Sequence, residues 1–95
     1  MAIFVPEALV LIDTDPYSAE EVFQKLRTCE DVKECFMVTG VYDVVARVEG
    51  ETLDQLVNVI NRRIESLFQV KETLSMIIVE PKKTFQQQEN GAIIV

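Results

Sequence analysis

Three residues, Thr39-Gly40-Val41, separate two apolar segments in the middle of the chain, and this spacing constrains the fold more than any other feature. The two segments run over residues 32–38 and 42–49 and are rich in valine, which favours strands. A connection this short implies an antiparallel hairpin. Gly50 is expected to end the second strand. The sequence therefore predicts two adjacent strands with a glycine in the turn between them.

Two further strands are predicted, one over residues 7–13 and one over residues 70–80, where Pro81 is expected to stop it. The first of these is apolar on both faces. Its two faces consist of Ala8, Val10 and Ile12 and of Leu9 and Leu11. A strand of this kind is expected to be covered on both sides.

Capping-box patterns predict the starts of two helices. Ser18 and Glu21 precede a helix predicted over residues 19–28, and Tyr17 and Val22 are placed to form a hydrophobic staple around its first turn. The side chains expected to point inward are those of Val22, Phe23 and Leu26.

The second capping-box pattern is Thr52 with Gln55, ahead of a helix predicted to reach about Ser66. Its expected apolar stripe consists of Leu53, Leu56, Val57, Ile60 and Ile64. The order of elements is then β-α-β-β-α-β. Because crossover connections are right-handed, both helices are expected on one face of a four-stranded antiparallel sheet, which is the α+β ferredoxin-like plait.

The helices can cover only one face of that sheet. Leaving the other apolar face in water would cost roughly 25 cal/mol per Å² of apolar area, so a dimer through this face is expected. Residues 1–80 are predicted to form the domain and residues 81–95 a tail. The tail ends in the apolar segment Ala92-Ile93-Ile94-Val95, which either adds a strand to a sheet edge or is disordered.

Composition disfavours several classes of function. The net charge of −7 argues against a surface for nucleic acid or for anionic membranes. The chain has no histidine, no nucleophile elbow and no phosphate-binding loop, so no catalytic residue and no cofactor are expected. Cys29 and Cys35 supply too few donors for a zinc site and are interpreted as inert thiols. With no signal peptide and no membrane-spanning run, a soluble cytoplasmic protein is expected.

Tyr42 and Asp43 are the most informative polar side chains, because they leave the glycine turn beside an apolar sheet edge. Two interpretations of Asp43 are open: it caps the turn by accepting hydrogen bonds from backbone amides, or it pairs with a cationic ligand. Thr73 and Ser75 share one face of the last predicted strand. They mark either an exposed edge or a donor pair for a ligand carboxylate.

The Thr39-Gly40-Val41-Tyr42-Asp43 turn before an apolar strand, with the Val32-Lys33-Glu34 strand entry, resembles the ligand-binding (RAM) domain of Lrp/AsnC transcriptional regulators. The resemblance runs from about residue 7 to residue 80. It implies a site for amino acids or related small effectors where dimers meet, with Gly40, Tyr42 and Asp43 at the site. Thr39, Val41, Thr73 and Ser75 are weaker assignments to the same site.

This sequence departs from the family pattern in two places. Six residues precede Glu7, so it resembles a stand-alone version of the module without the helix-turn-helix domain. Phe68-Gln69 occupies a bend where relatives commonly carry Pro-Gly. The resemblance implies an oligomer of dimers that senses an amino-acid-like effector and joins or competes with full-length Lrp/AsnC regulators, without binding DNA itself.

Two alternatives remain open at this point. Ferredoxin-like dimers also include small enzymes, although this chain lacks an evident acid–base pair. An amino-acid sensor of the ACT type would instead bind its ligand near the loop after the first strand, at residues 13–17.

Overall fold

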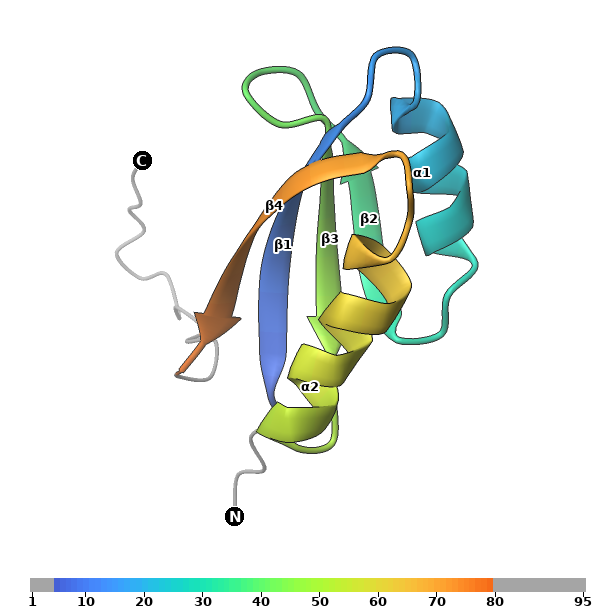
Figure 1. Ribbon diagram of the computed structural model, residues 1–95. Helices are drawn as coiled ribbons and strands as arrows, with labels where there is room; N and C mark the ends of the chain where they lie inside the picture. The colour runs from blue at the N-terminus through green and yellow to red at the C-terminus, as the bar shows by residue number, and fades with distance from the viewer. Residues whose placement is uncertain (1–4, 80–95) are drawn as a thin grey trace, which may run out of the picture.

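The fold is a four-stranded antiparallel sheet with both helices on one face, as the computed structural model shows for residues 5–79 (Figure 1). The sheet order is β2-β3-β1-β4. The elements in chain order are β1 (Glu7–Thr14), α1 (Ala19–Arg27), β2 (Val32–Met37), β3 (Val44–Glu49), α2 (Leu53–Val59), a π-helical continuation η1 (Ile60–Glu65) and β4 (Val70–Ile78). The ferredoxin-like plait is confirmed. The predicted tail and the last predicted residue of β4 lie outside the described residues.

The strand pairing sorts side chains into two faces. Rows of directly paired residues face the helices, and the central members of these rows are buried: Ala8, Val10, Ile12, Val44, Ala46 and Val48. Helix α1 adds Val22 and Leu26 to this core, as its spacing predicts. Successive side chains of a strand point to opposite faces, so Leu9 and Leu11 of β1 point away from Ala8, Val10 and Ile12. No described helix covers the face to which they point.

The apolar stripe of α2 is only partly where it was expected. Leu56, Ile60 and Ile64 are buried, but Leu53 and Val57 are about half exposed, and Val59 is buried in their place. Leu53 and Val57 flank the buried stripe on one side and Val59 flanks it on the other, and the side with Leu53 and Val57 faces solvent. The sequence has apolar residues on both sides of the stripe, so the pattern did not determine which side of α2 packs against the sheet.

The two capping-box patterns have different outcomes. Thr52 caps α2, because its Oγ1 accepts a 3.1 Å hydrogen bond from the backbone N–H of Gln55. Ser18 is at the N-cap position of α1, as predicted, but its side chain makes no cap hydrogen bond, so the predicted capping box is absent. The N–H of Ser18 instead donates to the carbonyl of Asp15 at 3.0 Å, which closes a turn with Tyr17 at φ +65°. This turn leaves the Tyr17 ring fully exposed, and the predicted staple is absent.

Replacing the two cap residues is therefore expected to have unequal effects. Thr52→Ala should lower the free energy of unfolding by about 1 kcal/mol, because an orphan amide of α2 loses its acceptor. Ser18→Ala should change it by less than about 0.5 kcal/mol, the usual range for a surface site without special contacts. Urea denaturation of both variants checks this, and equal losses would contradict the difference between the two caps.

Candidate functional site

The β2–β3 loop, residues 38–43, stands clear of the sheet at one end of the molecule (Figure 1). Its base is closed by a 2.9 Å hydrogen bond from the N–H of Val38 to the carbonyl of Asp43. Gly40 has φ +137°, a conformation that side-chain-bearing residues rarely adopt, and no atom lies within 4 Å of where a Cβ would be. Thr39 is exposed, and 85% of the Val41 surface is accessible. The loop thus presents an open tip that a ligand can reach.

Asp43 fastens this loop to β1. Its Oδ2 accepts a 2.9 Å hydrogen bond from the N–H of Thr14 and a 3.1 Å bond from the Thr14 hydroxyl. The N–H of Asp43 donates to the carbonyl of Ile12 at 2.9 Å. The carboxylate therefore accepts a hydrogen bond from a backbone amide, as the first of the two interpretations of Asp43 expects. That amide, however, belongs to β1 and not to the turn itself. Both bonds from Thr14 end on Oδ2, which leaves Oδ1 outside this contact.

The surroundings of Asp43 favour its ionised form. The backbone hydrogen bond from Thr14 is the main cause that lowers the pKa of Asp43 below its ordinary value of 3.8, and desolvation opposes it. The Thr14 hydroxyl, Asp13 and the positive charge of Lys71 lower the pKa further. A second carboxyl group and a cationic side chain thus lie in the electrostatic surroundings of Asp43, which remains a carboxylate at neutral pH.

This shift predicts how acid affects the contact between Asp43 and Thr14. A carboxyl whose pKa is lower in the folded state contributes stability above its ordinary pKa of 3.8, and that contribution is lost as the pH falls below this value. Asp43→Asn should therefore weaken the fold at neutral pH but flatten the fall in unfolding free energy below about pH 4. Denaturation at several pH values checks this; parallel curves for the two proteins would contradict it.

Thr73 and Ser75 lie on β4, an edge strand, and are separated from the β2–β3 loop by β1. They pair with Ile12 and Val10, so both are on the helix-facing side of the sheet. The Thr73 hydroxyl donates to Glu65 Oε2 at 2.9 Å, and Ser75 is exposed. Among the described residues, no hydrogen bond joins either hydroxyl to Asp43. The structure thus brings the loop residues together and places the predicted donor pair elsewhere.

The sequence pattern did not identify Thr14, Asp13 and Lys71 as neighbours of Asp43. Thr14 and Asp43 are 29 positions apart, and only the antiparallel pairing of β1 with β3 brings them into contact. The one signal available was the position of Thr14 at the end of an apolar strand. That position indicates a strand end but does not identify the neighbour.

The sheet face opposite the helices carries an unbroken apolar row. Direct strand pairing places Phe36, Val45, Leu11 and Leu74 side by side across all four strands. Phe36 and Leu74 are about half exposed in the single chain. We call this side of the sheet the open face.

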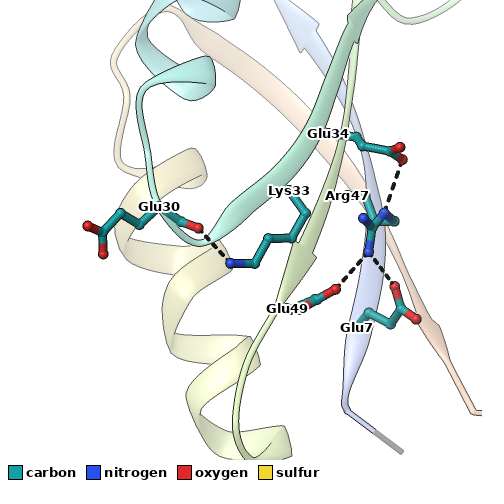
Figure 2. A network of polar contacts seen from close by, with 6 residues as sticks. All are labelled: Glu7, Glu30, Lys33, Glu34, Arg47 and Glu49. Carbon is teal, nitrogen blue, oxygen red and sulfur yellow. Dashed lines mark hydrogen bonds and ion pairs between the residues drawn. The ribbon is translucent and has the colours of Figure 1, made fainter.

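A charged cluster borders this row on the open face (Figure 2). The Arg47 guanidinium contacts carboxylate oxygens of Glu49, Glu7 and Glu34 at 2.8, 2.9 and 3.1 Å. These three acceptors raise the pKa of Arg47, so its charge is permanent. Figure 2 also shows Lys33, which donates to the carbonyl of Glu30 at 2.9 Å. An apolar row with a charged border is the usual anatomy of a protein interface.

Cys29 and Cys35 are free and half-buried, and burial raises the pKa of Cys35 while the Arg27 charge opposes this. A raised pKa keeps the thiol protonated and unreactive. Among residues 5–79, no helix is long and apolar enough to cross a membrane.

The order of elements and the strand order define this protein as a ferredoxin-like module. The family model of the Lrp/AsnC ligand binding domain matches residues 7–87, and the chain belongs to that family. The match extends past residue 80, where the predicted domain ended.

Known proteins support this assignment. The chain is 27% identical over 73 residues to the proline dehydrogenase transcriptional activator of Rhizobium radiobacter, covering 77% of this chain and 47% of that protein. It thus spans about half the length of this curated relative. The crystal structure of FFRP-DM1 aligns with a TM-score of 0.75 and 33% identity, over 80% of this chain and all of that one.

A transcriptional regulator of Neisseria meningitidis, crystallised as a complex with L-Met, shares the fold. Its TM-score is 0.71 at 18% identity, over 87% of this chain and 55% of that chain. This likeness concerns the fold alone. The family match itself indicates a ligand-binding domain.

Proposed function

We propose that this chain binds a small amino-acid-like effector at the β2–β3 loop and couples that binding to the assembly of subunits. The observation that carries the proposal is Asp43, a carboxylate held in its ionised form beside an open glycine loop. Thr14 bonds only its Oδ2, so the remaining oxygen is the proposed acceptor for a ligand ammonium.

The ligand carboxylate is assigned to backbone amides near Gly40, with Tyr42 lining the site. The loop tip is exposed in the single chain, so a ligand there would be half in water. A second subunit packed on Thr39 and Val41 would exclude that water and strengthen the charge pairing. Because β1 separates Thr73 and Ser75 from Asp43 within one subunit, we assign them a role only through a neighbouring subunit.

The proposed unit of assembly is a dimer through the open face. Its apolar row spans the whole width of the sheet, and the Arg47 cluster would form a polar border. A ligand at a subunit junction stabilises whichever assembly it binds, so effector and oligomer are thermodynamically linked. Higher oligomers of such dimers would place loops from different dimers together. The module would act in the cytoplasm on full-length Lrp/AsnC regulators, without direct contact to DNA.

The test begins with a thermal-shift screen of the common amino acids on the wild-type chain. Calorimetric titration of the best compound then compares the wild type with Asp43→Ala and Thr14→Val. Asp43→Ala is expected to weaken binding at least ~10-fold, since it removes the charge that pairs with the ammonium. Thr14→Val is the matched control, because it removes one hydrogen bond to Asp43 but keeps the carboxylate.

The two interpretations of Asp43 give opposite results. If the carboxylate only ties the loop to β1, both variants lose about 1 kcal/mol or more of stability and bind the compound as the wild type does. Equal affinities would return Asp43 to a structural role. A screen in which no amino acid raises the melting temperature would remove the effector assignment for this class of compounds.

A further inference from the structure

The end of β4 carries partly exposed apolar side chains on both faces, and no other described element covers it fully. Met76 on the open face and Ile77 on the helix-facing side have 44% and 38% of their surfaces accessible. Ile77 pairs with Ala8 of β1, which is fully buried. The helices therefore cover the sheet at β1 but leave β4 partly exposed at this position. Figure 1 shows this end of β4 on the side of β1 away from both helices. β4 is the last strand in the order β2-β3-β1-β4, so among residues 5–79 no strand pairs with its outer edge.

A dimer through the open face would not remove this exposure. Such a dimer can cover Leu74 and Met76, which point to the open face, but Ile77 points to the other side of the sheet. A strand added to the outer edge of β4 is the arrangement that covers side chains on both faces and pairs with the backbone groups of that edge. An exposed apolar edge of this kind is otherwise a site of aggregation.

The sequence holds a segment that fits this edge. Residues 92–95, Ala-Ile-Ile-Val, lie beyond residue 87, where the match to the family ends. In an extended conformation, Ile93 and Val95 point to one side and Ala92 and Ile94 to the other, so the segment is apolar on both faces, as the end of β4 is. The residues between, 86–91, are polar and end in Gly91, a composition typical of a connecting loop.

We propose that residues 92–95 pair antiparallel with the outer edge of their own β4 and form a fifth strand. Four residues at about 3.3 Å each span roughly 13 Å, enough to run beside the last four residues of β4. The chain between Val79 and Ala92 is long enough to reverse direction and return along this edge. A short connection also holds the segment at an effective concentration near ~1 mM, so at micromolar protein it pairs within its own chain before it reaches another. This proposal does not depend on the effector site.

Hydrogen exchange of the backbone amides tests the proposal. The full chain is compared by mass spectrometry with a chain ending at Gly91 and with Ile94→Asp; Gln88→Asp is the matched control, because it adds the same charge within the polar connection. Removal of residues 92–95, or Ile94→Asp, is expected to speed exchange at residues 75–78 at least ~10-fold, with β2 and β3 unchanged. Gln88→Asp should exchange as the wild type does.

Two outcomes would overturn the proposal. Equal exchange rates in β4 for the full and the shortened chains would show that the segment does not pair with this edge. Protection of β4 that falls when the full chain is diluted 100-fold, or a change in oligomer mass on truncation measured by light scattering, would show that the segment pairs with another subunit. Protection independent of concentration, with unchanged mass, supports the strand within one chain.

Discussion

Leu11→Asp is expected to be monomeric at concentrations where the wild-type chain is a dimer. Leu11 lies in the middle of the apolar row on the open face, with Val45 and Leu74 paired on either side of it. In a symmetric dimer the substitution occurs twice, so two carboxylates without partners would be taken out of water. Each such charge costs several kcal/mol when buried, so the dissociation constant should rise about 100-fold or more. Light scattering and sedimentation over a concentration series measure this.

The control is Leu53→Asp, the same substitution on the helix-covered side of the molecule. Leu53 is about half exposed at the first position of α2, where an acidic side chain suits the helix N-terminus. This variant should keep the oligomeric state of the wild type. A wild-type chain that is monomeric at micromolar concentration, or a Leu11→Asp variant that stays dimeric, would show that another surface mediates assembly.

Gly50→Ala is expected to destabilise the fold by about 3 kcal/mol, a melting temperature lower by roughly 15 °C. A Cβ at this position would lie 2.6 Å from the backbone nitrogen of Leu56 and 2.8 Å from its Cα. These are backbone atoms of α2, so no side-chain rotation relieves the contact. Leu56 is fully buried, and α2 would have to move off the sheet at the point where it contributes to the core.

Gly40→Ala separates this steric effect from the backbone preference of glycine. At Gly40 a Cβ would meet no atom within 4 Å, but φ is +137°, so only the backbone strain of the new residue remains. Its expected cost is about 1 kcal/mol. Calorimetric melting of both variants measures the difference, and a loss at Gly50 no larger than that at Gly40 would show that α2 adjusts at little cost.

The position of Asp43 connects stability and ligand binding in this protein. Its carboxylate joins the loop to β1 through Thr14, and the same group is the proposed ammonium acceptor. A ligand that draws the carboxylate toward the loop tip would therefore compete with Thr14 or share the charge through Oδ1. The comparison of Asp43→Ala with Thr14→Val distinguishes a residue that binds from one that only holds the loop.

Local pattern predicted most of the elements because each depends on nearby residues. The alternation in residues 7–13, the hairpin around Gly40 and the cap at Thr52 are properties of nearby positions, and all three appear in the structure. The connection at Gly40 is longer than predicted, since it runs over residues 38–43 instead of 39–41. The order of elements then restricted the possible topologies of the sheet, because crossover connections between strands are right-handed. Ser18 stands at the predicted N-cap position of α1, but its side chain makes no cap bond, and its N–H closes the turn through Pro16 and Tyr17. Pattern alone did not show which of the two local structures is more stable.

Tertiary structure decided the contacts between strands, and these determine the candidate site. The sequence by itself established a β-α-β-β-α-β module with a glycine loop and a carboxylate beside it. Only the pairing of β1 with β3 placed Thr14 against Asp43, only pairing across all four strands aligned Leu11 with Phe36 and Leu74, and only the reach of the helices left Ile77 uncovered. The physical reason is that strand register depends on the summed packing of distant residues, whereas helix and turn signals depend on neighbours along the chain.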